Sequence, residues 1–165
     1  MTTARTPFAR RSFRGVAVAA IAGAGIALSP LPASAHTAVA ASASATAVSS
    51  AAQTAVNTAL AQVGDRYVYG ATGPNSFDCS GLTTFSYKAA GISLPRTSKA
   101  QSGFGAPVSK ANLQPGDLVF FYSPVSHVAM YIGNGQIVHA LNASKPVQVM
   151  KLDSMPRYAG ARRVA

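Results

Sequence analysis

The chain has 165 residues, room for one domain of moderate size, and its 14 Lys and Arg against 4 acids give a formal net charge of +10. Its single cysteine excludes a disulfide-stapled scaffold and a zinc ribbon, and its 48% of hydrophobic residues excludes a disordered polyelectrolyte. The positive charge by itself leaves nucleic-acid binding open.

The first 35 residues have the pattern of a secretory signal peptide. A basic segment without acids precedes an apolar run over 16–28, and Ala33-Ser34-Ala35 forms a cleavage signal of the A-x-A type. The apolar run is shorter than the roughly 20 residues of a membrane-spanning helix, so we expect no stable membrane anchor. The pair Arg10-Arg11 also fits a twin-arginine signal; the alternative is an ordinary export signal with clustered arginines.

Cleavage between Ala35 and His36 predicts a secreted protein, either extracellular or associated with the cell wall. Residues 36–50 consist mainly of Ala, Ser and Thr without a bulky anchor, so we interpret them as a tether. Loss of residues 1–35 removes four arginines and no acid, which lowers the net charge from +10 to +6. The folded domain is then expected at 51–165.

Three helices are expected at the start of this domain. The first two have apolar side chains at helical spacing and a glycine stop, and the third is short. The expected ranges are 51–63, stopped by Gly64; 78–90, stopped by Gly91; and a short helix capped by Thr97 or Ser98 that ends at Gly103.

After Pro115-Gly116 the hydrophobic period changes to that of strands. Because helices come first and strands afterwards, the sequence predicts an α+β fold, with N-terminal helices packed on a five- to six-stranded antiparallel sheet. The five strands expected are 117–122, 127–132, 136–140, 147–150 and 158–164.

Cys79 is the first candidate for chemistry, because it stands where the second helix begins. The unpaired N–H groups and the positive dipole end of a helix N-terminus stabilise a thiolate, which predicts a lowered pKa and a better nucleophile. The alternative is a small cysteine that packs in the core.

His127 and His139 lie on two strands that flank a tight turn. A three-residue loop at 133–135 would pair positions that sum to 268, which puts both histidines on one face as diagonal neighbours, roughly 5–8 Å apart. A two-residue loop would put them on opposite faces. The hypothesis of a joint site therefore predicts an odd loop.

A cysteine, a base histidine and a polar group that orients the base make up a site for nucleophilic thiol catalysis. In this hypothesis His127 holds the Cys79 thiolate as an ion pair and later protonates a leaving amine, and His139 fixes the tautomer of His127. Two alternatives remain open: structural imidazoles, or a zinc site of two His and one Cys with an open position. No acid lies close to either histidine in the sequence to support such a zinc site.

Local motifs extend the pattern over nearly the whole folded part. They are Tyr67-Val68-Tyr69-Gly70, Phe77-Asp78-Cys79-Ser80-Gly81-Leu82, Gly91-Ile92-Ser93-Leu94-Pro95-Arg96, the run from Leu113 to Phe121, the run from His127 to Gly135, and Ile137-Val138-His139-Ala140. In this order and spacing, residues 51–165 resemble the NlpC family of bacterial cell-wall cysteine peptidases, which are papain-like.

The resemblance implies roles for six residues. The nucleophile falls on Cys79, the base on His127 and the third polar residue on His139. The family's tyrosine, which assists the oxyanion site and substrate placement, falls on Tyr67. The positions that receive the free amine of the stem peptide fall on Asp78 and Ser80.

The implied activity is cleavage of peptidoglycan stem peptides, typically between D-γ-glutamate and a diamino acid, through a thioester and without a metal or organic cofactor. Two departures from the family pattern affect the expected shape of the substrate groove. They are Tyr69-Gly70-Ala71 in place of Trp-Gly-Gly, and Ala129 in place of Gly. The alternatives are a wall amidase or acyltransferase with the same triad, and a non-catalytic wall-binding module.

We expect a monomer that acts on stem peptides and binds no nucleic acid, since much of the positive charge lies in the segment expected to be removed. The remaining +6 either attracts anionic wall polymers or is an ordinary solvated surface.

Overall fold

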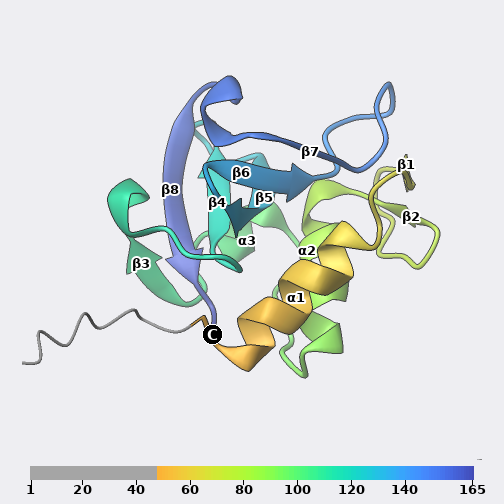
Figure 1. Cartoon of the computed structure of the whole chain (residues 1–165). Coiled ribbons are helices and arrows are strands. Elements are labelled where there is room, and N and C mark those ends of the chain that lie inside the picture. The colour runs from red at the N-terminus through yellow and green to blue at the C-terminus, as the bar shows by residue number, and fades with distance from the viewer. Residues whose placement is uncertain (1–47) are drawn as a thin grey trace, which may run out of the picture. The chain divides into compact units, whose positions relative to one another are not determined.

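The computed structural model describes residues 48–165 (Figure 1). The predicted export signal, its cleavage point and residues 36–47 of the predicted tether lie outside the described residues. The end of that tether is corrected, because its last residue is the first residue of a helix and the residue before it caps that helix. Ser49 is the N-cap, with its hydroxyl accepting a hydrogen bond from the N–H of Ala52, and the helix begins at Ser50.

Three α-helices form the N-terminal half: α1 (Ser50–Leu60), α2 (Cys79–Ala89) and α3 (Ser98–Gln101). The α2 and α3 predictions are confirmed, with Asp78 and Thr97 as N-caps and Gly91 in the left-handed region just after α2. The prediction for α1 ran too far at its C-terminus. Beyond Leu60 the chain turns so that the N–H of Gly64 bonds to the carbonyl of Val147, which leaves Val63 48% exposed. Within residues 48–165, no helix combines the length and hydropathy needed to cross a membrane.

The strands form one antiparallel sheet of six, in the order β3-β8-β4-β5-β6-β7, and a small parallel pair, β1 (Arg66–Tyr67) with β2 (Ser76–Phe77). The five predicted strands are confirmed as β4 to β8, and β3 is an addition at the sheet edge. Two short 3₁₀ turns, η1 (Lys110–Asn112) and η2 (Leu152–Ser154), connect strands. The strand bounds are β3 Ala106–Val108, β4 Leu118–Phe121, β5 His127–Gly133, β6 Gln136–His139, β7 Gln148–Lys151 and β8 Tyr158–Arg163.

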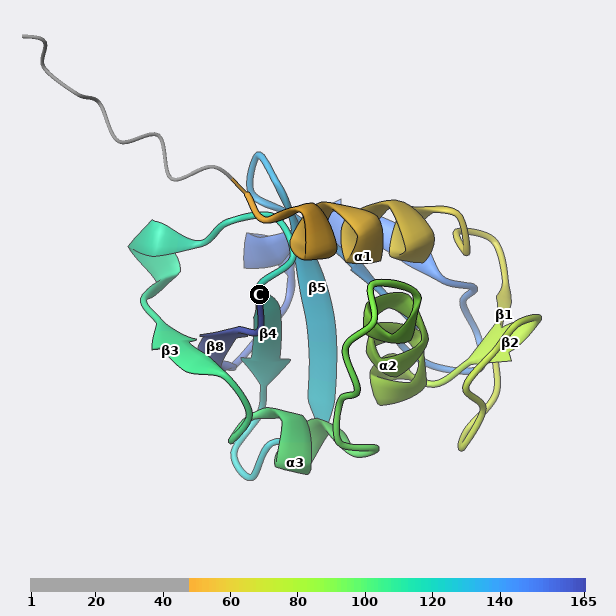
Figure 2. The same ribbon diagram turned by 90° about the horizontal axis from the view of Figure 1, so that it is seen from below.

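The helices α1 and α2 lie side by side and cover one face of the sheet, with β5 running past both (Figure 2). Alternate residues of β4 divide between two apolar clusters: Leu118 and Phe120 join the helices, whereas Val119 and Phe121 join the cluster on the opposite face. Each such side chain, fully buried, contributes roughly 1.5–3 kcal/mol to stability. This packing fixes the start of α2 against β5.

The hairpin between β5 and β6 has the predicted register, but its loop length differs from the prediction and a bulge makes up the difference. Met130 pairs with Val138 and Tyr131 with Ile137, as expected, but Gly133 pairs with Gln136. The loop therefore has two residues, Asn134 and Gly135, both at positive φ, and the prediction of an odd loop is wrong. A bulge between Tyr131 and Gly133 adds the missing residue and returns both histidines to one face.

Candidate active site

The motif Asp78-Cys79-Ser80-Gly81 builds the start of α2. Asp78 is extended and caps the helix, with its carboxylate accepting a hydrogen bond of 2.6 Å from the N–H of Gly81. The N–H of Asp78 donates to the carbonyl of Ala71 at 3.0 Å. A Cβ at position 81 would overlap that carbonyl oxygen, so only glycine fits there. Cys79 is thereby held as the first residue of the helix.

The Cys79 thiol lies against β5, where its partner is the backbone of Val128, the residue that follows His127. The backbone N–H groups of Val128 and Ser80 donate hydrogen bonds to its sulfur, and they favour the thiolate. Burial is the larger effect, however, and together with the Asp78 carboxylate it raises the pKa of the Cys79 thiol above its ordinary value. The prediction of a lowered pKa is therefore wrong for the free protein, because the thiol is mostly withdrawn from water.

His127 and His139 meet as predicted. His127 Nε2 and His139 Nδ1 are 3.0 Å apart, in a buried hydrogen bond between the two imidazoles. Burial, and then the neighbouring His139, lowers the pKa of His127 to about 3; burial, and then Lys145, lowers the pKa of His139 to about 4. Both rings are neutral near pH 7, so the free protein holds a thiol and an imidazole in place of the predicted ion pair.

The shared hydrogen bond restricts the tautomers of the pair. If His127 donates from Nε2, its Nδ1 is left with a lone pair and is available as a base. His139 must then carry its own proton on Nε2, an atom that is buried and has no hydrogen-bond partner among the described residues. The bond therefore prepares His127 for proton transfer while it leaves one polar atom of His139 unsatisfied.

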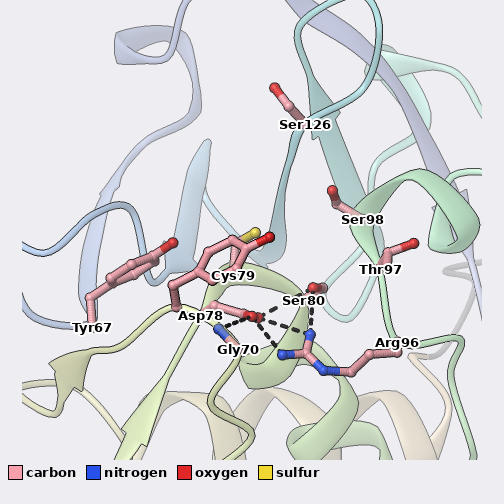
Figure 3. A pocket seen from close by; sticks show the side chains of 10 residues that line it. Tyr67, Gly70, Asp78, Cys79, Ser80, Arg96, Thr97, Ser98 and Ser126 are labelled. Carbon is pink, nitrogen blue, oxygen red and sulfur yellow. Dashed lines mark hydrogen bonds and ion pairs between the residues drawn. The ribbon is translucent and has the colours of Figure 1, made fainter.

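Asp78 is the centre of a second polar network (Figure 3). Its carboxylate accepts from both terminal nitrogens of Arg96, at 3.1 and 2.6 Å, and from the N–H of Gly70 at 2.9 Å. Burial alone would raise the pKa of Asp78, but the bonds from Arg96, Gly81 and Gly70 outweigh it and hold this pKa below its ordinary value. Arg96 also donates to Ser80 Oγ at 2.9 Å, so Asp78 and Ser80 are joined through one guanidinium.

A cavity of about 390 Å³ opens over the cysteine. Figure 3 shows Tyr67 on one side of the Cys79 sulfur and Thr97, Ser98 and Ser126 on the other. Burial and the nearby Cys79 and Asp78 raise the pKa of Tyr67, which keeps its phenol neutral and able to donate a hydrogen bond. Four of the six predicted site residues, Tyr67, Asp78, Cys79 and Ser80, line this cavity.

The sequence analysis did not identify Arg96, Ser98 and Ser126 as site residues. Arg96 stood inside a recognised motif, and its signal was an arginine next to a predicted helix cap in a chain with only four acids. Ser98 and Ser126 gave no signal of a role in the site, because Ser98 was recognised only as a possible helix cap and Ser126 as a loop serine. Only the folded chain brings both to the cavity over the thiol. The zinc alternative gains no geometric support: residues 48–165 contain no group of three or more His, Cys, Asp or Glu side chains placed to hold a metal ion.

Comparison with known proteins gives a family match and several curated relatives. Residues 64–163 match the family model described as the NlpC/P60 family. The chain is 48% identical over 114 residues to a probable endopeptidase of Corynebacterium glutamicum, a match that covers 69% of this chain and 54% of the relative. It is 42% identical over 121 residues to a gamma-D-glutamyl-L-lysine dipeptidyl-peptidase of Bacillus cereus, covering 68% of this chain and 36% of the relative.

A solved structure shows the same fold. The NlpC/p60 domain of the peptidoglycan hydrolase SagA superposes with a TM-score of 0.63 at 30% identity, over 68% of this chain and 97% of that domain. The expectation of a papain-like α+β domain with a six-stranded antiparallel sheet is thus confirmed. The chain matches only about half of the length of the Corynebacterium relative and about a third of the Bacillus relative.

Proposed function

Because the chain belongs to the NlpC/P60 family, we propose that it is a cysteine endopeptidase that cleaves the stem peptides of peptidoglycan, at the bond between D-γ-glutamate and a diamino acid. The observation that carries the proposal is the buried pair of His127 and His139, hydrogen-bonded at 3.0 Å beside a cysteine at a helix N-terminus. The names of the relatives support the same chemistry, one as an endopeptidase and one as acting on a γ-D-glutamyl bond.

The proposed reaction begins with proton transfer inside the neutral pair. His127 Nδ1 takes the proton of the Cys79 thiol as the sulfur attacks the γ-carbonyl carbon, and the C=O electron pair moves to oxygen. The proposal assigns stabilisation of this oxyanion to backbone N–H groups at the start of α2 and to the phenol of Tyr67, whose raised pKa keeps it protonated as a donor. The resulting imidazolium is held by His139 through the 3.0 Å bond.

Collapse of the tetrahedral species completes the acyl transfer. The C–N bond breaks, His127 gives its proton to the leaving amine of the diamino acid, and the acyl group stays on Cys79 as a thioester. Water then attacks the thioester with His127 again as base, and His127 returns the proton to the departing sulfur. The cycle consumes one water and needs no redox partner.

The proposal assigns Asp78 and Ser80 to the free amine of the substrate. Asp78 attracts a cation, but its carboxylate already accepts bonds from Arg96, Gly70, Gly81 and Ser80. An incoming amine therefore displaces at least one contact of Arg96, whose side chain is 40% exposed and reachable from the cavity. This exchange would make the amine pocket selective for substrates that can compete with a guanidinium.

We further propose that the catalytic domain works outside the cytoplasm. The pattern of residues 1–35 supports export followed by cleavage near Ala35-His36, and the composition of the following segment supports a tether that leads to α1. The excess of six positive charges after residue 35 supports attraction to anionic wall polymers.

The test is digestion of purified cell wall and of defined stem peptides by the purified chain. The Cys79→Ala variant should release no soluble fragments, because it removes the nucleophile, and Cys79→Ser should be nearly as inactive because a hydroxyl is far less acidic. Mass spectrometry of the new termini distinguishes γ-glutamyl cleavage from amidase or acyltransferase products. Undiminished release by Cys79→Ala would refute the proposal.

A further inference from the structure

A second cavity, of about 230 Å³, adjoins the first and shares Tyr67 with it. Its remaining lining comes from β1 and from the loop between β6 and β7, which lie beside each other in Figure 1. The lining residues are Arg66, Tyr67, Ala143, Ser144, Lys145 and Pro146.

The loop that forms this cavity is held in place from two directions. Val147 donates its N–H to the carbonyl of Asp65 at 2.8 Å and accepts from the N–H of Gly64 at 2.9 Å, which docks the loop onto the start of β1. Within the loop, Asn142 accepts hydrogen bonds from the N–H groups of Ser144 and Lys145. Ser144 and Lys145 are therefore carried on a fixed backbone.

The cavity carries two positive charges, Arg66 and Lys145, that form no ion pair among the described residues. Three of the four acids among residues 48–165 form ion pairs, with Arg96, Arg163 and Lys110 as partners. Neither Arg66 nor Lys145 takes part in any of these pairs. Both are exposed at the cavity, and the charge of Lys145 reaches the buried His139 strongly enough to lower its pKa.

The position of the cavity relates it to the leaving group. In the proposed reaction His127 protonates the amine that departs, so that fragment lies on the side of the histidines. Strand β6 ends at His139 and continues directly into the loop that carries Lys145. The residues proposed to hold the other fragment, Asp78 and Ser80, line the first cavity and not the second.

We propose that Arg66, Ser144 and Lys145 form a subsite for a carboxylate of the leaving fragment. Two cationic donors and a hydroxyl suit a carboxylate, whereas a lysine side chain would bring its ammonium to these cations without the carboxylate that accompanies it in diaminopimelate. The carboxylate has two sources, the side chain of a diaminopimelate-type diamino acid or the C-terminus of the leaving peptide. The inference deepens the proposed function and rests on it.

The experiment uses four L-Ala-γ-D-Glu-X-D-Ala peptides, in which X is diaminopimelate or lysine and the C-terminus is an acid or an amide. Specificity constants are measured for the purified chain and for Arg66→Gln and Lys145→Gln. The matched control is Lys88→Gln, which removes the same charge from an exposed position in the last turn of α2, outside both cavities. Comparing diaminopimelate with lysine, and the C-terminal acid with the amide, shows which carboxylate the subsite binds.

We expect loss of the recognised carboxylate to lower kcat/KM of the unmodified chain by about tenfold, the size of one charge-assisted contact. The ratio of kcat/KM with the carboxylate to kcat/KM without it should fall toward one in Arg66→Gln and Lys145→Gln. Lys88→Gln should keep the ratio of the unmodified chain. Ratios near one for both carboxylates in the unmodified chain, or ratios unchanged in the two cavity variants, would overturn the subsite.

A binding measurement distinguishes failure of the carboxylate subsite from failure of the proposed endopeptidase function. If no peptide is cleaved, or if Cys79→Ala still cleaves, the endopeptidase proposal fails. Calorimetric titration of the Cys79→Ala chain with diaminopimelyl-D-alanine and with lysyl-D-alanine amide then tests the subsite alone. Tighter binding of the carboxylated fragment, lost on adding Lys145→Gln, supports it, and equal binding refutes it.

Discussion

Burial of His139 lowers the stability of the fold, and its role in orienting His127 explains why it is buried. Its side chain is fully buried, its pKa is lowered to about 4, and its Nε2 has no partner among the described residues. An unsatisfied buried polar atom costs about 1–3 kcal/mol. In exchange, His139 makes the 3.0 Å hydrogen bond that leaves Nδ1 of His127 as the free base. At the scale of single residues, stability is thus exchanged for the orientation of a proton acceptor.

Substitution of His139 tests this orientation. The Asn variant retains an acceptor for His127 Nε2, whereas His139→Ala removes it, so we expect a loss in kcat of about 10²-fold or more for Ala and a smaller loss for Asn. The tautomer of His127, measured by ¹⁵N NMR, should shift only in the Ala variant. Equal losses in both variants with an unchanged tautomer would indicate a merely structural role.

Sequence reasoning identified the residues that motifs place, and it missed those that only the fold brings in. Cys79, His127 and His139 stand at positions that helix start and strand register determine. Arg96 reaches Asp78 across 18 residues of chain, so no local period announces the contact. The state of the thiol was also beyond the sequence, because burial, which raises its pKa, depends on β5 and not on the helix N-terminus alone.

At the scale of elements, the start of α2 depends on one close approach. A Cβ at Gly81 would overlap the Ala71 carbonyl, and this carbonyl also accepts from the N–H of Asp78. We expect Gly81→Ala to lower the free energy of unfolding by about 1–3 kcal/mol through overpacking, and to reduce the reactivity of Cys79 as the helix shifts.

The matched control is Gly103→Ala, where a Cβ would meet only the carbonyl of Ala100 at 3.7 Å, an ordinary contact. Urea unfolding and the rate of thiol labelling measure both variants. A Gly81→Ala protein as stable and as reactive as the control would contradict the argument.

Apart from α3, which its cap predicted, the elements that the sequence predicted are those long enough to show a period. Both long helices and five strands were found in this way, whereas β1, β2 and β3 have two or three residues each. Strand β3 also contains Pro107, which suits only an edge strand and argues against a strand when seen in sequence. Short pairings of this kind follow from the assembled sheet and leave no local pattern.

At the scale of the whole molecule, the two buried histidines link folding to pH. Their pKa values are about 3 and 4 in the folded chain, below the ordinary 6.5 of an unfolded histidine. As pH falls below 6.5 the unfolded chain binds two protons that the folded chain does not. Stability should therefore be full above pH 6.5 and fall by about 1.4 kcal/mol per pH unit for each histidine toward pH 4.

Urea unfolding at pH 7, 6 and 5 measures this dependence. His139→Asn should reduce the slope by about half, since one of the two groups is gone. Asp78 does not interfere in this window, because its lowered pKa makes it lose its stabilising effect only at more acidic pH. A free energy of unfolding that stays constant from pH 7 to pH 5 would disprove the link.

The bulge between Tyr131 and Gly133 has an evolutionary consequence. Surface hairpins usually tolerate insertions and deletions, but here a single-residue deletion at the bulge would exchange the two faces of β6 relative to β5. His139 would then leave His127 without any change in the identity of a site residue. Active homologues should therefore differ in length at this hairpin by even numbers or carry a compensating bulge. An odd difference without such a bulge would mark a lineage that has lost the reaction.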